Sequence, residues 1–364
     1  MVLSRNCHVS AVSACILAGA VPFFADAPVD KDLGIAHAVS PEALAQALDA
    51  AAAACAAAPE QGTLDEQPLR RRRRVGLALA VSPTYFGAVA DIAALARVAH
   101  DRGVPLAVDE AHGAHFVFDP RLPMPALACG ADVAVQSTHK TLPALTQASM
   151  LHVSDTCRVS TSRLSSCLTV LQTTSPSYLL LASLDAVRQG AMHARTGVRS
   201  TTDACIALRA SLAALAPDLH ILGARPVAGV HAWDTTRLTL AAESLGHESG
   251  YAAGDALIQQ GITVELTAPR CVVLVVGGGN ANSTDLERLQ RVLLDMHARS
   301  RGRASSSSSD ALPQFPPSQI QMAMPPRQAF FAPRTAVPVE LATGRVSAEW
   351  LCPYPPVRAS LVEH

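Results

Sequence analysis

Three apolar segments of this chain each end in a group of polar residues. They are Val75–Pro83, Val104–Gly113 and a segment that ends at Gln136. Continuous apolar runs of this length are typical of strands buried on both faces of a parallel sheet. Between the first two, Asp91–Gly103 has apolar residues at helical spacing and a terminal glycine, which predicts a helix. The alternation of strands and helices favours a doubly wound α/β fold.

The polar groups that follow the three predicted strands are Ser82–Tyr85, Asp109–His115 and Ser137–Lys140. In doubly wound sheets, ligands bind beyond the carboxyl ends of the strands. We therefore expect the three groups to meet at one edge of the sheet and to form a ligand site. Their coincidence carries more weight than any one of them alone.

The rest of the chain continues the α/β pattern. Ser40 can cap a helix that runs to Ala57, with Pro41 in its first turn. A short helix is expected before Gly130, and a long helix over Ser175–Gly197. A second α/β segment follows, with strands in 236–242 and 261–279 and helices in 250–260 and 283–300.

The N-terminal sequence MVLSRNCHVSAVSACILAGAVPFFADA supports two interpretations. An arginine, an apolar stretch and a small-residue end imitate a signal peptide. The same residues fit a helix over Ser10–Ala20 followed by a short strand over Val21–Phe24. The pattern alone leaves both open, and the family resemblance described below favours the helix and strand of a folded domain.

Composition excludes several classes of protein. Hydrophobic residues make up 49% of the 364 residues, which predicts a buried core. A net charge of −1 and 4% aromatic residues provide neither a basic field nor a stacking surface for nucleic acid, and Arg70–Arg74 is interpreted as part of a solvated loop. No apolar run reaches membrane-spanning length. Nine scattered cysteines without a CxxC pair indicate reduced thiols inside a cell.

Several motifs do not carry the chemistry that they first suggest. Asp109–His112 reads DEAH, a helicase motif, but the chain has no phosphate-binding loop with the required lysine. His112 and His115, with His139 nearby, could offer metal ligands, but the chain has no HExxH motif and no metal is expected. Val275–Asn280 reads VVGGGN, which lacks the GxGxxG pattern and is interpreted as a tight turn.

Lysine is rare in this chain. Among 29 lysine and arginine residues, only Lys31 and Lys140 are lysines. Lys140 and Asp109 each follow a predicted buried strand. A lysine in a partly dry cleft can lose its proton and form a Schiff base, and a carboxylate can keep a pyridine nitrogen protonated. These are the two protein groups that pyridoxal 5′-phosphate (PLP) chemistry requires, although a salt bridge between Asp109 and an arginine, with Lys140 on the surface, remains the alternative.

Longer motifs extend this interpretation. The stretches RNCHVSAV, SPTYFG, VDEAHGAHFVF, LPMPALACGADVAVQSTHKTLPALTQASMLHV, LQTTSPSYLLLASLDAVR, VPVELATGRVSAE and CPYPP resemble the Orn/Lys/Arg decarboxylase family. The resemblance covers most of the chain, with the Arg-rich loop 59–74 and the linker Ser305–Ser309 as insertions. It implies a fold-type-I PLP-dependent transferase-like fold. The implied domains are a PLP-binding major domain over 1–186, a small C-terminal α/β domain over 187–304, and a linker with a Pro-rich tail over 305–364.

The resemblance also implies roles for individual residues. Lys140 matches the lysine that binds PLP covalently, and Asp109 the aspartate that pairs with the pyridinium nitrogen. Ala111 and His8 match residues on the two faces of the ring. The remaining implied cofactor contacts are Ser137 and His139 at the phosphate and Thr84 at the 3′ oxygen, with Thr173, Thr174 and Ser175 near the site of a partner subunit.

The implied reaction is decarboxylation of arginine, lysine or ornithine to an amine in polyamine metabolism, with arginine slightly ahead. His112 and Lys140 are the candidate donors of the proton that replaces carbon dioxide at Cα. Glu265 or Glu349 could meet the distal cation, although ordinary pairing is the competing interpretation for each. We expect a cytoplasmic homodimer or higher homo-oligomer, without excluding an organelle.

The chain departs from the family pattern at its N-terminal side. Family members carry a segment before RNCH, including a turn that binds the cofactor phosphate, and Val9 stands where the family has lysine. The major domain is therefore expected to be N-terminally truncated. This keeps a second hypothesis open, a catalytically inactive relative that binds or regulates a partner. An aminotransferase or another lyase on the same fold is a third, which the motifs around Lys140 oppose.

Overall fold

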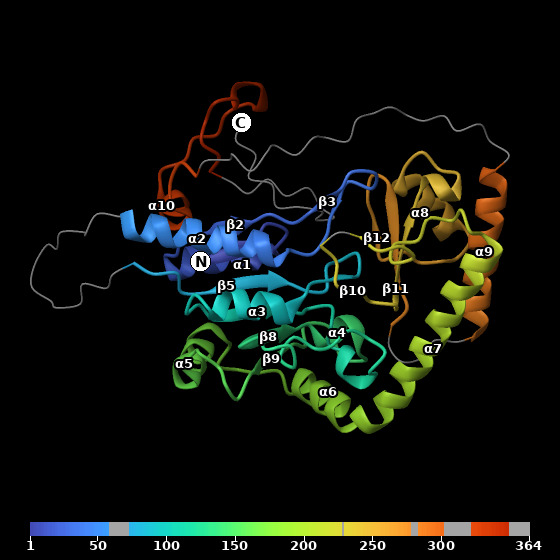
Figure 1. Cartoon of the computed structure of the whole chain (residues 1–364), viewed down its shortest axis with the longest axis horizontal. Helices are drawn as coiled ribbons and strands as arrows, with labels where there is room; N and C mark the ends of the chain where they lie inside the picture. The colour runs from blue at the N-terminus through green and yellow to red at the C-terminus, as the bar shows by residue number, and fades with distance from the viewer. Residues whose placement is uncertain (58–72, 228, 278–282, 302–321, 349–364) are drawn as a thin grey trace, which may run out of the picture.

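A mostly parallel sheet organises the N-terminal half of the chain in the computed structural model, which describes residues 1–57, 73–227, 229–277, 283–301 and 322–348 (Figure 1). Its strand order is β2-β1-β5-β7-β8-β9. All neighbours are parallel except β9, which pairs antiparallel with β8. The bounds are β1 Val2–Ser4, β2 Phe23–Ala25, β5 Ala78–Val81, β7 Leu106–Asp109, β8 Val133–Gln136 and β9 Met150–Val153.

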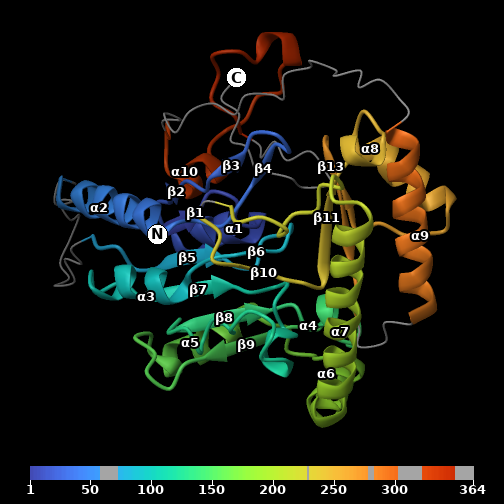
Figure 2. The ribbon, with the colours of Figure 1, turned by 45° about the vertical axis from the view of Figure 1, so that its right-hand side comes forward.

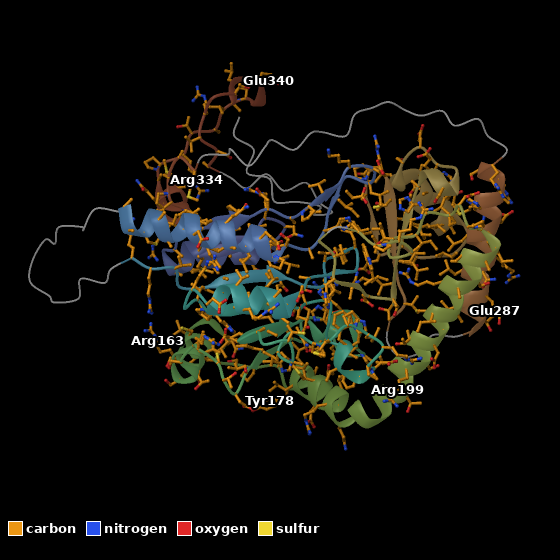
Figure 3. The ribbon with its side chains drawn as sticks, in the orientation of Figure 1. Arg163, Tyr178, Arg199, Glu287, Arg334 and Glu340 are labelled. Atoms are coloured by element: carbon orange, nitrogen blue, oxygen red, sulfur yellow. The ribbon has the colours of Figure 1, made fainter. Side chains whose placement is uncertain are left out.

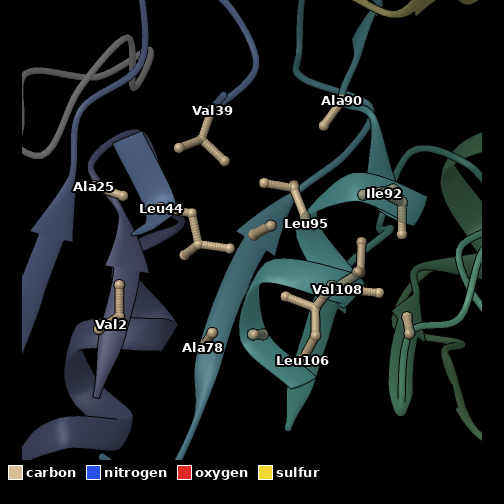
Figure 4. Packing of buried hydrophobic residues seen from close by; sticks show 14 of the residues in the cluster. Val2, Ala25, Val39, Leu44, Ala78, Ala90, Ile92, Leu95, Leu106 and Val108 are labelled. Atoms are coloured by element: carbon tan, nitrogen blue, oxygen red, sulfur yellow. The ribbon is translucent and has the colours of Figure 1, made fainter. Parts of the chain in front are cut away.

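Helices cover both faces of this sheet. On one face, α2 (Pro41–Ala57) and α3 (Ile92–His100) contribute Leu44, Leu48 and Leu95 to a core that includes Leu106 (Figure 4). On the other face, α1 (Val9–Ala18) packs Val12 and Cys15 against Leu3. Because successive strand residues point to opposite faces, β1 and β5 contribute to both cores. The layers of a doubly wound fold predicted from the sequence are confirmed.

A second, antiparallel sheet has the order β11-β13-β12. Figure 2 shows it at one end of the molecule with α7, α8 and α9. Leu212, Leu257 and Leu293, one from each helix, pack on this sheet. The bounds are β11 Arg237–Ala241, β12 Leu266–Thr267, β13 Cys271–Val275, α7 Ala191–Leu215, α8 Gly250–Gln259 and α9 Ser283–Ser300.

Short pairings connect these parts. β6 (Ala88–Val89), which follows β5, pairs antiparallel with β10 (Ala232–Trp233), which precedes β11. This pairing brings the start of β11 close to the loop that follows β5 in the large sheet. β3 (Val29–Asp30) and β4 (Ile35–Ala36) form a two-stranded ladder. The tail helix α10 (Pro326–Phe331) returns to α1, where Arg327 donates to the Leu17 carbonyl at 3.0 Å.

Two expected helices are wrong. The segment before Gly130 is a series of turns in which Cys129 N–H donates to Pro125 and Ala126 carbonyls. The expected long helix over 175–197 is two helices, α6 (Tyr178–Gln189) and α7, separated at Gly190. Gly190 ends α6 by donating to the Ala186 carbonyl, and the chain then turns into α7 (Figure 1). A glycine costs a helix interior about 1 kcal/mol, so a break there is inexpensive.

The expectation for the N-terminal residues is confirmed, because they form α1 and β2 of the large sheet. Among the described residues, no helix is both long enough and apolar enough to cross a membrane. The expected loop at 59–74 and turn at 275–280 fall partly outside the described residues, and the linker Ser305–Ser309 falls wholly outside them.

Candidate active site

Four parallel strands deliver polar residues to one edge of the large sheet. His8 follows β1, Thr84 follows β5, Asp109 ends β7 and Lys140 follows β8. Side-chain contacts join the three predicted polar groups. The Tyr85 and His112 rings meet edge to face with centroids 4.8 Å apart, and His112 Nε2 lies 3.3 Å from Lys140 Nζ. The predicted convergence at the carboxyl ends of the strands is confirmed.

Lys140 lies in the short helix α4 (Thr138–Thr141), whose turn closes with its N–H donating to the Ser137 carbonyl at 3.0 Å. The residue as a whole is exposed. Partial burial of the amine nevertheless lowers the pKa of Lys140, and Arg237 lowers it further, while Asp109 and Glu265 act in the opposite direction. A lowered pKa increases the fraction of neutral amine, which is the nucleophilic form.

Asp109 is placed by the last position of β7, where it pairs with Val81 and Val135 on the neighbouring strands. Its Oδ1 accepts from the Ala111 N–H at 3.1 Å, which orients the carboxylate across the turn that follows β7. Asp109 is near enough to Lys140 to favour its protonated form. The chain thus brings together the carboxylate and the amine that the sequence predicted, although 31 positions separate them.

His112 is buried between the two sheets. Its Nδ1 lies 2.6 Å from Arg237 Nη2, and its Nε2 faces Lys140. Burial lowers the pKa of His112 well below the ordinary histidine value, and the positive charges of Arg237 and Lys140 lower it further. His112 is therefore a neutral imidazole at neutral pH.

Arg237 is a site residue that sequence reasoning missed. It begins β11, is 2% exposed, and donates from Nη1 to the Tyr85 carbonyl at 2.9 Å. Its Nε lies 3.6 Å from Asp234 Oδ2. Burial opposes ionisation of Asp234, but His115, Arg237 and Thr236 hold the pKa of this carboxyl below its ordinary range. One sequence feature could have identified Arg237, namely an arginine inside the apolar strand TRLTLAA. A buried arginine requires hydrogen-bond or charge partners.

His8 and Thr84 lie at the predicted edge and make local contacts. His8 is exposed and caps α1, with its Nδ1 accepting from Ser10 N–H at 3.3 Å and lying 2.8 Å from Ser10 Oγ. Thr84 is buried, and its Oγ1 accepts from Ala88 N–H at 3.1 Å. The Thr84 bond closes the loop that carries Tyr85 toward His112.

Ser137 and His139, the predicted phosphate contacts, flank the start of α4. The Ser137 side chain forms no capping hydrogen bond. His139 Nδ1 donates to the Ala148 carbonyl at 2.8 Å, which directs Nε2 away from that carbonyl. In the same helix, the buried hydroxyls of Thr138 and Thr141 have no hydrogen-bond partner among the described residues.

Other residues singled out in the sequence have structural partners. Glu110 is buried and accepts from Gln136 Nε2 at 2.7 Å and from Ala126 N–H at 2.8 Å, and burial raises its pKa. His115 Nε2 lies 3.3 Å from Asp234 Oδ1. Glu110 and His115 therefore stabilise the fold at this edge of the sheet.

Two further sets of predicted residues are exposed. Thr173, Thr174 and Ser175 occupy the exposed loop between α5 (Thr161–Leu171) and α6. Glu265, which precedes β12, is exposed and its Oε1 accepts from the Tyr85 hydroxyl at 2.8 Å. Glu349 lies outside the described residues.

The side chains present fit PLP. Lys140 offers an amine of lowered pKa, Asp109 a carboxylate at the neighbouring strand end, and Ser137 a hydroxyl not engaged in capping. A lysine and an aspartate at the carboxyl ends of adjacent strands in a mostly parallel sheet are the arrangement expected of a fold-type-I PLP-dependent enzyme.

Comparison with known proteins specifies the family. The model for "Orn/Lys/Arg decarboxylase, major domain" matches residues 1–235. The chain is 32% identical over 364 residues to the arginine decarboxylase of Bacillus subtilis (strain 168), covering 98% of this chain and 68% of that protein. It is 34% identical over 364 residues to the arginine decarboxylase of Halalkalibacterium halodurans, with the same coverage. The chain belongs to the Orn/Lys/Arg decarboxylase family, whose members are PLP-dependent amino-acid decarboxylases.

Solved structures support the same fold. Lysine decarboxylase A from Pseudomonas aeruginosa matches with a TM-score of 0.74 and 21% identity, covering 99% of this chain and 58% of that one. The constitutive lysine decarboxylase of E. coli matches with a TM-score of 0.72 and 17% identity, covering 100% of this chain and 60% of that one. The chain therefore spans somewhat more than half the length of these two structures.

Proposed function

We propose that this chain acts in the PLP-dependent decarboxylation of a basic amino acid, with arginine as the first candidate. The observation that carries the proposal is the position of Lys140, whose amine has a lowered pKa and lies 3.3 Å from a neutral His112 at the edge that also holds Asp109. Two of its relatives, at 32% and 34% identity, are named arginine decarboxylase. These names support the reaction and the choice of arginine as the first candidate substrate.

When bound, PLP supplies an electron sink for the pair of electrons left at Cα by departing carbon dioxide. Lys140 would hold the aldehyde carbon of the cofactor, and Asp109 would keep its ring nitrogen protonated. Ala111 and His8 would contact the ring. The proposed contacts at the edge of the ring are Ser137 and His139 with the phosphate and Thr84 with the 3′ oxygen.

After carbon dioxide leaves, a proton must reach Cα on the side that faces the protein. Two side chains are candidates, Lys140 through its ammonium form and His112, which lies next to it. Tyr85 covers His112 from the loop after β5 and limits the access of water to this proton path. The product is the amine of the substrate, so a role in polyamine metabolism follows if the substrate is arginine, lysine or ornithine.

We also propose that the chain self-associates through the end of α5 and the start of α6. No residue of α5 is buried. Val170 is 81% exposed, Leu171 68%, Tyr178 80% and Leu179 75%. Figure 3 shows Tyr178 at the outer edge of the molecule. Contiguous exposed apolar side chains favour a protein partner, and the loop of Thr173, Thr174 and Ser175 between them would face that second copy.

Two measurements test the proposed function. The purified chain is mixed with PLP, and the visible absorbance of covalently bound cofactor is recorded for the wild type and for Lys140→Ala. Release of carbon dioxide from carboxyl-labelled arginine, lysine and ornithine then identifies the substrate. We expect absorbance and release from the wild type alone. Absorbance without release would favour the inactive binding relative, and an unchanged Lys140→Ala variant would overturn the assignment of the lysine.

A further inference from the structure

The contact between Arg237 and His112 fixes the position of a proton. A guanidinium has five N–H donors and no acceptor, and it stays charged in proteins. At 2.6 Å from Arg237 Nη2, His112 Nδ1 must therefore accept the hydrogen bond. An accepting Nδ1 carries no hydrogen, which excludes both the imidazolium and the tautomer protonated at Nδ1.

The second contact of His112 then fixes the state of Lys140. A neutral imidazole without hydrogen at Nδ1 carries it at Nε2, which lies 3.3 Å from Lys140 Nζ. An ammonium is also purely a donor, so this contact is a hydrogen bond only when the amine is neutral and accepts from Nε2–H. Burial lowers the pKa of both groups, in agreement with a neutral pair.

The surroundings hold Arg237 in this orientation. Its Nη1 donates to the Tyr85 carbonyl at 2.9 Å, and its Nε faces Asp234 Oδ2 at 3.6 Å. A Cβ built on Gly87 would stand 3.2 Å from the Arg237 Cβ, so the loop after β5 closes tightly on this side chain. The titratable and charged groups around His112 are Tyr85, Lys140, Arg237, Asp234 and His115.

We propose that Arg237 is a positioning residue that locks His112 as the Nε2–H tautomer, so that His112 orients the Lys140 amine and Lys140 alone carries the proton to Cα. The inference rests on the proposed function and decides between its two proton donors. Donation from neutral His112 would leave an imidazolate. Lys140 can instead become an ammonium by taking the proton that the α-ammonium of the substrate gives up on binding, and donation of this proton to Cα returns the neutral amine. The Nε2–H of His112 also repels that ammonium and makes it a stronger acid.

The tautomer is measured directly on the cofactor-free protein. Histidine labelled with ¹⁵N is incorporated, and the His112 signals are assigned by their loss in His112→Gln. We expect an unprotonated Nδ1 and a protonated Nε2 at neutral pH. A protonated Nδ1, alone or in an imidazolium, would overturn the proposal. This measurement needs neither decarboxylase activity nor a folded Arg237 variant, so its outcome is separate from that of the proposed function.

Two substitutions of Arg237 separate its hydrogen bond from its bulk. Arg237→Lys retains a purely donating cation and should retain the tautomer. Arg237→Gln offers an amide that can donate or accept, so His112 should show a mixture of tautomers. Arg5→Gln is the control, because Arg5 is a partly buried arginine that pairs with Asp26 and contacts neither Arg237 nor His112. If His112 keeps the single Nε2–H tautomer in Arg237→Gln, Arg237 does not determine the tautomer and the proposal is contradicted.

The second readout is the titration of Lys140, which the rarity of lysine makes tractable. Reductive ¹³C-methylation labels the two lysines, and the signal from the exposed Lys31 serves as an internal reference. We expect the Lys140 pKa to rise by roughly one unit or more in Arg237→Gln and to stay low in Arg237→Lys. An Arg237→Gln protein that folds and leaves the Lys140 titration unchanged would overturn the proposal.

Discussion

The Tyr85 hydroxyl donates a 2.8 Å hydrogen bond to the Glu265 carboxylate, 180 residues further along the chain. Tyr85 also packs edge-on against His112, and the charge of Glu265 acts on both Lys140 and Arg237. Glu265 is therefore an acidic side chain near the candidate catalytic lysine, supplied by the segment that leads into the antiparallel sheet. The ordinary pairing weighed in the sequence analysis is present, and it holds the carboxylate beside the site.

This arrangement predicts a role for Glu265 in substrate binding if the proposed function is correct. Glu265→Gln should raise the KM for the basic amino acid about 10- to 100-fold, because a hydrogen bond to a charged group contributes about 1.5–3 kcal/mol, with a smaller effect on kcat. Steady-state kinetics with arginine, lysine and ornithine measure both constants. Glu248→Gln changes another exposed carboxylate and is the control. A change confined to kcat would argue against contact with the distal cation.

Replacement of Lys140 should have effects of a different kind. Lys140→Arg keeps a positive charge but cannot form the covalent link, since a guanidinium stays protonated. We expect loss of the visible absorbance of bound PLP and a fall in kcat of more than about 1,000-fold, as is usual for a lost nucleophile. Lys31→Arg makes the same exchange at an exposed site and should match the wild type. Equal activity of the two variants would contradict the assignment.

The parts of the fold that follow from local pattern could be predicted from the sequence. Buried parallel strands show as continuous apolar runs, and their ends place polar residues at one edge, so Asp109 and Lys140 were found together. The helix at 41–57 follows from its cap and composition. The break at Gly190 was missed because a single glycine is compatible with either a continuous or an interrupted helix.

Long-range partners could not be predicted in the same way. The contact of Arg237 with His112 joins a residue of β11 to one in the turn after β7, 125 positions apart, and no local rule specifies such a pair. The role of Glu110 was also hidden, because a carboxylate beside Asp109 has the same appearance in sequence whether it acts in chemistry or accepts bonds in the core. Only the folded structure identified Gln136 and Ala126 as its donors.

Three histidines predict how stability depends on pH. Burial lowers the pKa of His112, His37 and His152 in the folded chain. Between that lowered pKa and the unfolded value of about 6.5, the unfolded chain binds more protons, so the free energy of unfolding falls as the pH falls. Each fully shifted histidine contributes up to about 1.4 kcal/mol per pH unit.

Urea unfolding of the cofactor-free chain between about pH 7 and pH 5 measures this slope. His112→Gln should reduce the slope by up to about 1.4 kcal/mol per pH unit. Val12→Ala removes part of a buried apolar side chain and should lower stability at every pH without changing the slope. A wild-type stability that rises on acidification through this range would contradict the neutral state of the buried histidines.

We expect Glu110 to stabilise the folded chain. Glu110→Ala leaves the Ala126 N–H and the Gln136 amide without their acceptor in a buried region, at a cost of about 2–3 kcal/mol. Glu110→Gln keeps one acceptor oxygen and should cost less. Urea unfolding at constant pH compares the two variants with Glu248→Ala, which removes an exposed carboxylate. Wild-type stability of Glu110→Ala would show that these hydrogen bonds contribute little.

The apolar surface at the α5–α6 corner predicts the effect of charge on assembly. Burying a leucine side chain contributes about 1.5–3 kcal/mol, so the double substitution Leu171→Glu with Leu179→Glu should shift the chain toward the monomer in sedimentation velocity. Ile258→Glu is the matched control, because Ile258 is 55% exposed on α8, outside this corner. If the wild type self-associates and the double variant keeps the same sedimentation coefficient, the interface lies elsewhere. If the α8 control dissociates instead, the second copy binds the face of the antiparallel sheet domain and the exposed end of α5 has another role.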